Sequence, residues 1–339
     1  MPAREMPLIV DPAGRDNDLR TALDDLRMNR WLSTHDLLFK TGTDWALRTS
    51  RSQVLAVGAG DGGAIAAWLK EEPGNPDALM MWTRVLTRQA TRAMHRGVDG
   101  EVLRRAAGIA RDACWKALRR CPDDPVLWIC LLCLAGLPLD ARYLDPFYRH
   151  RPHHWGRPSD PTLPPGPWPL LDEVERRDPG NREAYHRMRE YFHARVSLSH
   201  AVDFSRWVAM SGRAGSPLLM LPLYAFVTEY QCWHGDGRGA AIRYWSTDRV
   251  VHHTRRARDD WFYRVSGTMR AQMSLLDLNH LAHALTACGE PGAEQVFEAI
   301  GPYATSAPWA QVSSSLGRDW QVEFCRLRDA AHRKAARYR

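Results

Sequence analysis

The sequence predicts an all-α protein arranged as a superhelical array of antiparallel helix hairpins, an α-solenoid. Apolar residues recur at helical spacing over segments of about ten to twenty residues, whereas alternating β-branched stretches are scarce. Short motifs also recur at the ends of these segments, which is typical of repeat proteins. The 339 residues exceed the length of roughly 250–300 at which a single hydrophobic core stops growing, so two domains or one extended array are expected.

Helical patterning is clear in several segments, and Gly, Pro or Asn lies between most of them. The expected helices cover residues 19–28, 45–57, 77–94, 102–120, 182–195, 218–233, 276–286 and 320–337. Because the turns between them are short, neighbouring helices should pair in antiparallel fashion.

The junction between successive hairpins repeats along the chain. Residues 64–76 align with residues 113–125 without gaps, and residues 179–184 resemble residues 73–78. In these junctions a Pro ends one helix, an Asn or Asp that can cap follows, and a new helix begins with an acidic residue in its first turn.

The turn inside each hairpin repeats as well. Residues 60–68 match residues 289–297 without gaps, and residues 235–245 are a looser version with two extra residues. Each copy has a Gly at a helix end, an acidic residue, a small Ala and then an aromatic residue. The small residue lets paired helices approach closely, and the aromatic ring fills the space between hairpins.

These motifs resemble the tetratricopeptide repeat, a family that places a Gly in the first helix, a small Ala early in the second, an aromatic residue four positions on and a Pro twelve positions on. Ala64, Trp68 and Pro76 fit this spacing, and Ala113 with Pro125 fits it apart from the aromatic position. The junctions lie 49 and 57 residues apart, compared with about 34 in the family, so the repeats are degenerate or elongated.

Together with residues 26–38, the pattern is similar to actinobacterial proteins of this tetratricopeptide-like type. The resemblance implies a non-enzymatic bacterial scaffold that binds another protein or a peptide in a groove, and it carries over no catalytic residue and no cofactor. A cytoplasmic location is expected, because the sequence lacks a secretory apolar run and a membrane segment of roughly 18 apolar residues.

A boundary is expected near the middle of the chain. Nine Pro residues fall within residues 137–169, too many for a helix to continue. We therefore expect an N-terminal helical-repeat half over residues 1–136, a Pro-rich loop or linker over 137–169, and a C-terminal helical-repeat half over 170–339 that ends in a basic helix.

The net charge of +7 is concentrated in two segments. Residues 149–157 hold three basic and no acidic residues, and residues 318–339 hold seven basic and three acidic ones. Nucleic-acid binding through the loop and the terminal helix is therefore an alternative function. The candidate partner contacts in the Pro-rich segment and the terminal helix are Trp155, Trp168, Arg149, Arg151, Arg333 and Arg337.

Four arginines, Arg84, Arg88, Arg92 and Arg96, recur at every fourth residue of one expected helix. Each step of four residues turns a helix about 40° past a full turn, so these side chains form one slanted ridge. Such a ridge can bind an acidic peptide, or the carboxylate of a peptide terminus, through paired hydrogen bonds. We take it as the candidate anion-binding surface of the groove, with a solvated outer face as the alternative.

Residues 54–68 suggest a different class of function. Their glycines resemble the first motif of S-adenosylmethionine-dependent methyltransferases, in which a strand runs through a glycine turn into a helix. However, the same turn recurs at residue 289 in a helical setting, and a helix is expected from Asp77, where such an enzyme has a second strand. We therefore expect a turn between helices, and the methyltransferase stays as a further alternative.

The histidines do not predict a metal site. His280 and His283 share a helix face, and residues 153–154 and 252–253 are adjacent pairs. Acidic residues or thiols at metal-binding spacing do not accompany them.

Overall fold

The structure is a computed structural model, and it describes residues 8–139, 156–158, 160–235, 239–265, 273–313 and 317–337. Helices joined by turns make up the regular structure of these residues, and no strand occurs among them. The described residues form two isolated β-bridges, which pair Ile9 with Tyr303 and Gly156 with Gly166. The all-α prediction is confirmed.

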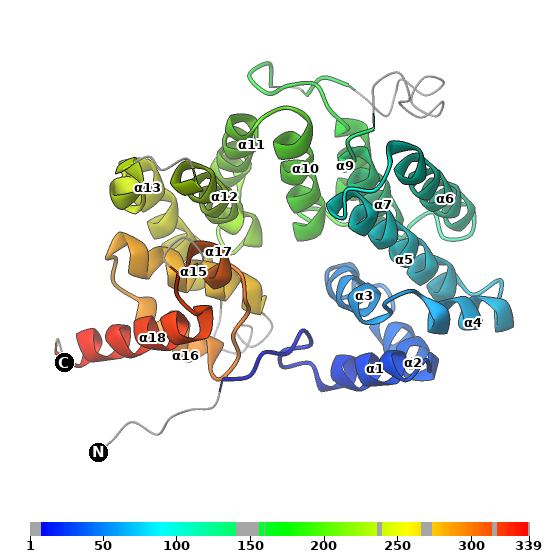
Figure 1. Cartoon of the computed structure of the whole chain (residues 1–339), viewed down its shortest axis with the longest axis horizontal. Helices are drawn as coiled ribbons and strands as arrows, with labels where there is room; N and C mark the ends of the chain where they lie inside the picture. Colours follow the sequence, from blue (N-terminus) through cyan, green and yellow to red (C-terminus); the bar gives the residue numbers. More distant parts are fainter. Residues whose placement is uncertain are drawn as a thin grey trace. The chain divides into compact units, whose positions relative to one another are not determined.

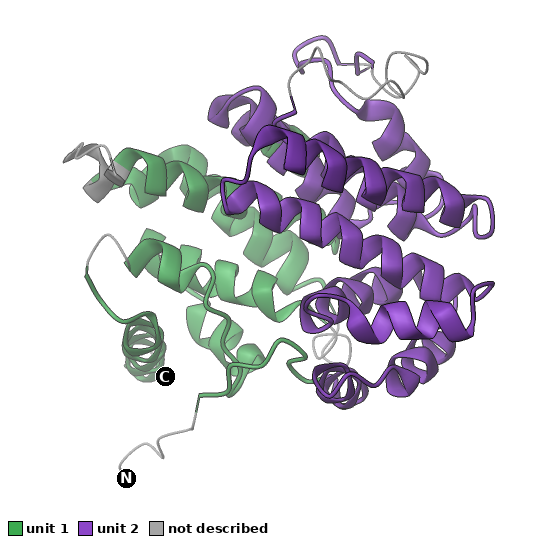
Figure 2. Ribbon diagram, turned by 45° about the vertical axis from the view of Figure 1, so that its right-hand side comes forward, with its two compact units in different colours: residues 1–15, 205–339 green, residues 16–204 purple. Residues whose placement is uncertain are grey.

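The chain forms two compact units, which Figure 2 shows in different colours. The N-terminal unit comprises residues 16–204, and the C-terminal unit comprises residues 1–15 together with residues 205–339. The division therefore falls near residue 204 and not within residues 137–169, where the sequence suggested a boundary.

The helices of the N-terminal unit follow one another from blue to green in Figure 1. They are α1 (Asn17–Arg27), α2 (Leu32–Thr41), α3 (Trp45–Gly58), α4 (Gly63–Glu71), α5 (Pro76–His95), α6 (Gly100–Leu118), α7 (Pro125–Ala135), α9 (Trp168–Glu175), α10 (Arg182–Arg195) and α11 (Leu198–Ser211), the last of which continues into the C-terminal unit.

The remaining helices belong to the C-terminal unit. They are the 3₁₀-helix η3 (Pro217–Met220), α12 (Leu221–Gly235), the 3₁₀-helix η4 (Gly239–Ser246), α13 (Asp248–Arg256), the π-helix η5 (Ala257–Phe262), α15 (Leu275–Cys288), α16 (Ala293–Ile300), α17 (Trp309–Ser313) and α18 (Trp320–Ala336).

Trp168 explains why the Pro-rich segment does not separate the two units. Its side chain is buried, and its ring lies 5.7 Å from that of Phe192 in α10 and 5.8 Å from that of Phe204 in α11. The indole nitrogen donates a hydrogen bond of 3.0 Å to the carbonyl of Pro164. Because α9 and α10 also pack on α7, the helices after the Pro-rich segment belong to the same core as those before it. Trp168 is thus an internal anchor and not a partner contact.

The repeated junctions begin helices, as the sequence predicts. Asn75, Asp124 and Asn181 occupy the equivalent positions and are the N-caps of α5, α7 and α10. The side-chain oxygen of each accepts a hydrogen bond from a backbone N–H two or three residues ahead. A cap of this kind stabilises a helix by about 1 kcal/mol.

The two matched glycine turns each end one helix and begin another. Gly60 and Gly289 have φ of 59° and 72°, in the left-handed region that glycine adopts without strain. The N-caps of the following helices, Gly62 and Gly292, have φ of 88° and 96°. In the gapless alignment Gly62 corresponds to Pro291, so the second left-handed position is shifted by one residue between the copies.

The small and aromatic residues after these turns are buried in both copies. Ala64 and Trp68 of α4 and Ala293 and Phe297 of α16 belong to the cores of their units. In the C-terminal unit, the rings of Phe297 and Trp309 lie 5.4 Å and 5.3 Å from that of Phe324 in α18. The basic terminal helix therefore packs one face on the core of its unit.

Candidate functional site

Three arginines of the predicted ridge lie in α5 and Arg96 is its C-cap residue, but the four do not share one environment. Arg84 is buried, Arg88 and Arg92 are partly exposed, and Arg96 is exposed. The rotation of about 40° at each four-residue step accounts for this gradient, since three steps turn the side chain by about 120°. The ridge therefore passes from the core to the surface.

Arg84 is held by an internal carboxylate and is not a ligand contact. Its Nη1 and Nη2 donate hydrogen bonds of 2.7 Å and 2.6 Å to the two carboxylate oxygens of Glu183 in α10. The guanidinium also donates to the carbonyl of Thr49 in α3 at 3.2 Å. Burial alone would raise the pKa of Glu183, but the Arg84 and Arg187 guanidinium groups hold that pKa below its ordinary value. The expected role of Arg84 in anion binding is corrected to a structural one.

Arg88 lies one turn further along α5 and has no such partner. Its Nε is buried and forms no hydrogen bond with any described residue. Burial, and then the like charge of Arg92, lowers the pKa of Arg88 below its ordinary value. Arg88 therefore adds positive potential beside Arg92, although it does not line the cleft described next.

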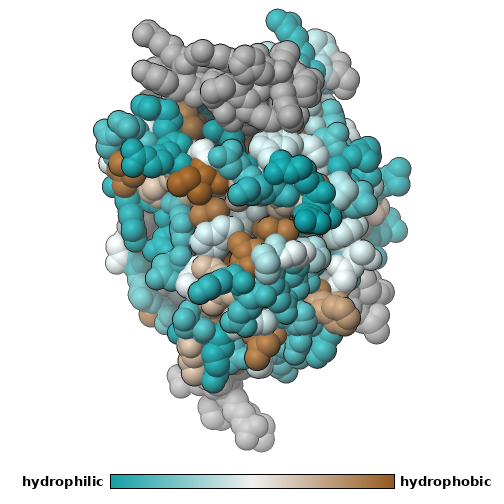
Figure 3. All heavy atoms as spheres, turned by 90° about the vertical axis from the view of Figure 1, so that its right-hand side faces the viewer, coloured by the Kyte–Doolittle hydropathy of each residue, from teal (hydrophilic) through white to brown (hydrophobic). Residues whose placement is uncertain are grey.

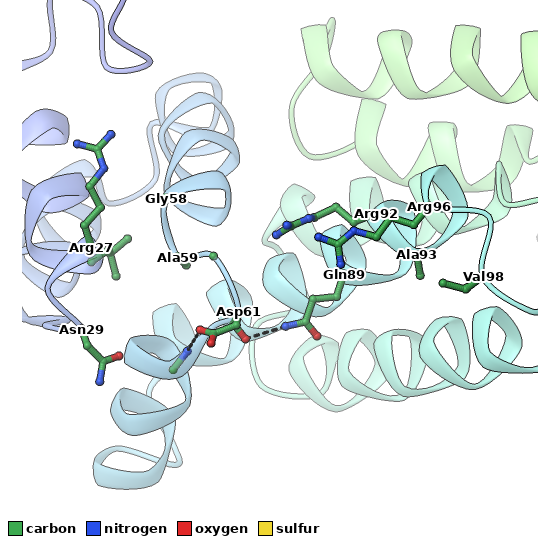
Figure 4. A pocket seen from close by; sticks show the side chains of 13 residues that line it. Arg27, Asn29, Gly58, Ala59, Asp61, Gln89, Arg92, Ala93, Arg96 and Val98 are labelled. Carbon is green, nitrogen blue, oxygen red and sulfur yellow. Dashed lines mark hydrogen bonds between the residues drawn. The ribbon is translucent and has the colours of Figure 1, made fainter.

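An open cleft of about 960 Å³ lies within the N-terminal unit, and Figure 4 shows it from close by. Its walls come from the end of α1, the turn between α3 and α4, and the last turns of α5. The described residues that line it are Leu26, Arg27, Asn29, Gly58, Ala59, Gly60, Asp61, Gly63, Gln89, Arg92, Ala93, Arg96 and Val98. In Figure 4 the Arg92 and Arg96 side chains reach from α5 towards the α3–α4 turn.

The glycine turn forms one side of this cleft and is tied to α5. The Nε2 of Gln89 donates a hydrogen bond of 2.8 Å to the carbonyl of Asp61. The carboxylate of Asp61 in turn accepts one of 3.2 Å from the amide of Gly63. At Gly62 a Cβ atom would lie 2.7 Å from Cγ1 of Val85, so the turn packs closely on α5. These contacts fix the distance between the turn and the arginines.

Positive charge dominates the cleft. Arg27 is paired with Asp24 at 2.7 Å on the exposed surface of α1. Arg92 and Arg96 form no ion pair with any residue that the structure describes. Asp61 is the single carboxylate among the described lining residues. The arrangement can hold an anionic group through charge-assisted hydrogen bonds.

The structure thus brings together two features that the sequence treated separately, the arginine ridge and the glycine turn. It also adds Arg27, Asn29 and Gln89, which the sequence reasoning did not find. The pattern over residues 26–38 contains Arg27 and Asn29 but does not mark them as site residues, because they reach the cleft only through the packing of α1 near the α3–α4 turn.

The same geometry bears on the methyltransferase alternative. Residues 54–58 are the end of α3 and not a strand. The strand, glycine turn and helix of a cofactor-binding unit are therefore not formed by residues 54–68. The glycines serve a turn between two helices.

The remaining candidate contacts fall in two groups. Trp155, Arg149 and Arg151 lie outside the described residues. Arg333 and Arg337 are exposed at the end of α18, where they are free to meet a partner.

Three histidines of the C-terminal unit are internal. His253, His280 and His283 are buried, and the rings of His280 and Tyr224 stack with centroids 3.6 Å apart. Within the described part of the chain, no three His, Cys, Asp or Glu side chains gather in a way that could hold a metal ion. No helix among the described residues is both long enough and apolar enough to span a membrane.

Exposed apolar side chains do not single out another site. The large ones on the N-terminal unit include Met28, Leu32, Phe39, Val102 and Ile109. Figure 3 shows one face of the molecule, on which hydrophobic groups lie apart among hydrophilic ones. Apolar residues scattered in this way are normal on a protein surface.

Comparison of the chain with protein-family models, with curated proteins and with solved structures gives no match. The function must therefore be argued from the residues of the cleft themselves.

Proposed function

We propose that the N-terminal unit binds an acidic segment of a partner protein in the cleft and catalyses no reaction. The observation that carries this proposal is the pair Arg92 and Arg96, whose guanidinium groups line one open cleft without a carboxylate partner among the described residues. Guanidinium groups bind carboxylates through paired, charge-assisted hydrogen bonds. An acidic segment would pair with Arg92 and Arg96 as the Glu183 carboxylate pairs with Arg84.

The repeated junctions and turns agree with this role. They resemble those of the tetratricopeptide repeat, and a scaffold of helix hairpins that presents a groove to a peptide is part of the same proposal. The volume of the cleft lies within the range of about 300–1,000 Å³ that is usual for binding pockets.

Labelled peptides of about ten residues, in acidic, neutral and basic versions, provide the test. Fluorescence anisotropy should show binding of the acidic peptides, and the double charge reversal Arg92→Glu with Arg96→Glu should weaken it by tenfold or more. The matched control is Arg119→Glu with Arg120→Glu, an equal change of charge at two exposed residues beyond the far end of α6.

Two results would contradict the proposal. If both double variants lose affinity equally, the net charge of the chain and not the cleft attracts the peptide. If the wild-type protein binds no acidic peptide at low salt, the cleft is not a site for such segments.

Nucleic-acid binding is the second candidate, and the exposed Arg333, Lys334 and Arg337 of α18 favour it. A single-stranded DNA oligonucleotide titrated at increasing salt concentration tests it, because affinity that depends on phosphate contacts falls steeply with added salt. The variant Arg333→Glu with Arg337→Glu should then lose affinity, whereas Arg92→Glu with Arg96→Glu should retain it.

A further inference from the structure

The two unpaired arginines of the cleft have a defined spacing along α5. They are separated by four residues, and a helix rises about 1.5 Å per residue, so their Cα atoms lie about 6 Å apart along the helix axis. Both residues line the cleft, and Figure 4 shows their side chains reaching towards the same turn. A ligand with two anionic groups at a similar spacing, about 6 Å, can therefore pair with both guanidinium groups.

Two peptide conformations supply this distance. In an extended chain, side chains two residues apart point to the same side and lie roughly 6.6 Å apart, because each residue adds about 3.3 Å. In a helical ligand, side chains four residues apart lie on one face about 6 Å apart. Adjacent acidic residues in an extended chain point to opposite faces, so they cannot both reach Arg92 and Arg96.

The opposite side of the cleft favours the extended conformation. Gly60 and Asp61 line the cleft, and neither the carbonyl nor the amide of the peptide unit between them forms a hydrogen bond with any described residue. Because the two groups of a trans peptide unit point in opposite directions, a ligand in the cleft can pair with one of them. An extended segment has a main-chain N–H or C=O group available for this bond, whereas a helix uses its own groups internally. Gly60 in this turn has no side chain, and nothing lies within 4 Å of its Cβ position, so a peptide backbone can approach it closely.

We infer that the cleft selects an extended peptide segment in which two acidic side chains are separated by one residue, with one carboxylate at Arg92 and the other at Arg96. This inference rests on the proposed function and specifies its ligand. The partially buried Arg88, one turn before Arg92, strengthens the positive potential at that end of the cleft. Asp61 faces the arginines from the other side and keeps acidic side chains directed at α5.

A set of amidated and acetylated peptides tests the spacing at constant charge. Each carries two aspartates in a Gly-Ser background, separated by zero, one, two or three residues, and a further peptide carries one aspartate. Anisotropy should show about tenfold tighter binding for the one-residue separation than for the zero- and two-residue separations. Each of the single variants Arg92→Gln and Arg96→Gln should bind the peptide with the one-residue separation only as tightly as the wild-type protein binds the one-aspartate peptide.

A control variant distinguishes a preference for spacing from the binding of acidic peptides in general. Arg119→Gln should leave the preference for spacing unchanged, and circular dichroism should show that all the variants are folded. Equal affinity for all two-aspartate peptides, or tightest binding at the three-residue separation of a helical ligand, would overturn the extended-segment inference while acidic peptides still bind. Failure of every acidic peptide to bind would overturn the proposed function as well.

Discussion

The Arg84 guanidinium and the Glu183 carboxylate form a buried ion pair with two hydrogen bonds that joins α5 to α10. The side chains are 7% and 4% exposed, and the shorter bond, from Nη2 to Oε2, measures 2.6 Å. Arg187 donates to the same carboxylate at 3.0 Å from one turn further along α10. Water cannot replace these partners at such low exposure, so the carboxylate depends on its cations.

Replacing Arg84 with Met should therefore destabilise the protein by about 3 kcal/mol, because Glu183 would stay buried with only one cation. Urea denaturation followed by circular dichroism measures the change. The matched control is Arg105→Met, which removes an exposed pair with Glu101 and should cost less than about 1 kcal/mol. Similar losses in the two variants would show that the buried pair does not stabilise the packing of α5 on α10.

The contrast between Arg84 and Arg96 also shows how far the sequence could predict the site. Helix caps and glycine turns can be predicted from the sequence, because capping and left-handed glycines depend on a few neighbouring residues. The caps are Asn75, Asp124 and Asn181. A four-residue repeat of arginines was also visible. Which of them meets a carboxylate was not, since Glu183 lies 99 residues from Arg84 in sequence.

The same limit applies to the domain division and to the walls of the cleft. Nine prolines in residues 137–169 predict a break in the helical array, but they do not reveal that Trp168 anchors the end of this segment in the core. Arg27 and Asn29 reach the cleft because the end of α1 lies near the α3–α4 turn. Such contacts arise from tertiary packing, which short-range patterns do not encode.

Gly62→Ala should destabilise the N-terminal unit by about 2 kcal/mol. The residue has φ of 88°, which an L side chain rarely adopts, and the added Cβ would lie 2.7 Å from Cγ1 of Val85. Gly74→Ala is the control, because its φ is ordinary and nothing lies within 4 Å of its Cβ position. Thermal denaturation should show a lower midpoint for the first variant and little change for the second. An unchanged midpoint for Gly62→Ala would mean that the turn adapts without cost.

His283 should make the stability of the C-terminal unit depend on pH. Burial lowers the pKa of His283 to about 4, and its Nδ1 has no hydrogen-bond partner in the described residues. The unfolded chain, with a histidine pKa of about 6.5, takes up a proton between about pH 6.5 and 4, whereas the folded protein does not. The contribution of the neutral His283 to the free energy of unfolding is therefore complete above about pH 6.5, and it is lost as the pH falls towards 4.

His283→Leu should reduce this pH dependence by roughly 3 kcal/mol between about pH 6.5 and 4, at about 1.4 kcal/mol per pH unit. Urea denaturation at several pH values provides the measurement. His332→Leu removes an exposed histidine of α18 and should leave the profile of the wild-type protein unchanged. A His283→Leu profile parallel to that of the wild-type protein would show that this histidine takes up its proton equally in both states.

Asp61→Asn should strengthen the binding of an acidic peptide by about threefold, because it removes the single carboxylate among the described lining residues. The fold should be retained, since an Asn side chain can still accept the hydrogen bond from the amide of Gly63. Asp123→Asn makes the same change of charge at an exposed residue of the α6–α7 junction and should alter affinity little. Anisotropy with the one-residue-separated aspartate peptide, at low and high salt, measures both. The gain in affinity should be smaller at high salt, because salt screens the repulsion that the substitution removes. An equal gain in Asp123→Asn would show that the net charge of the chain, and not Asp61 in the cleft, repels the peptide.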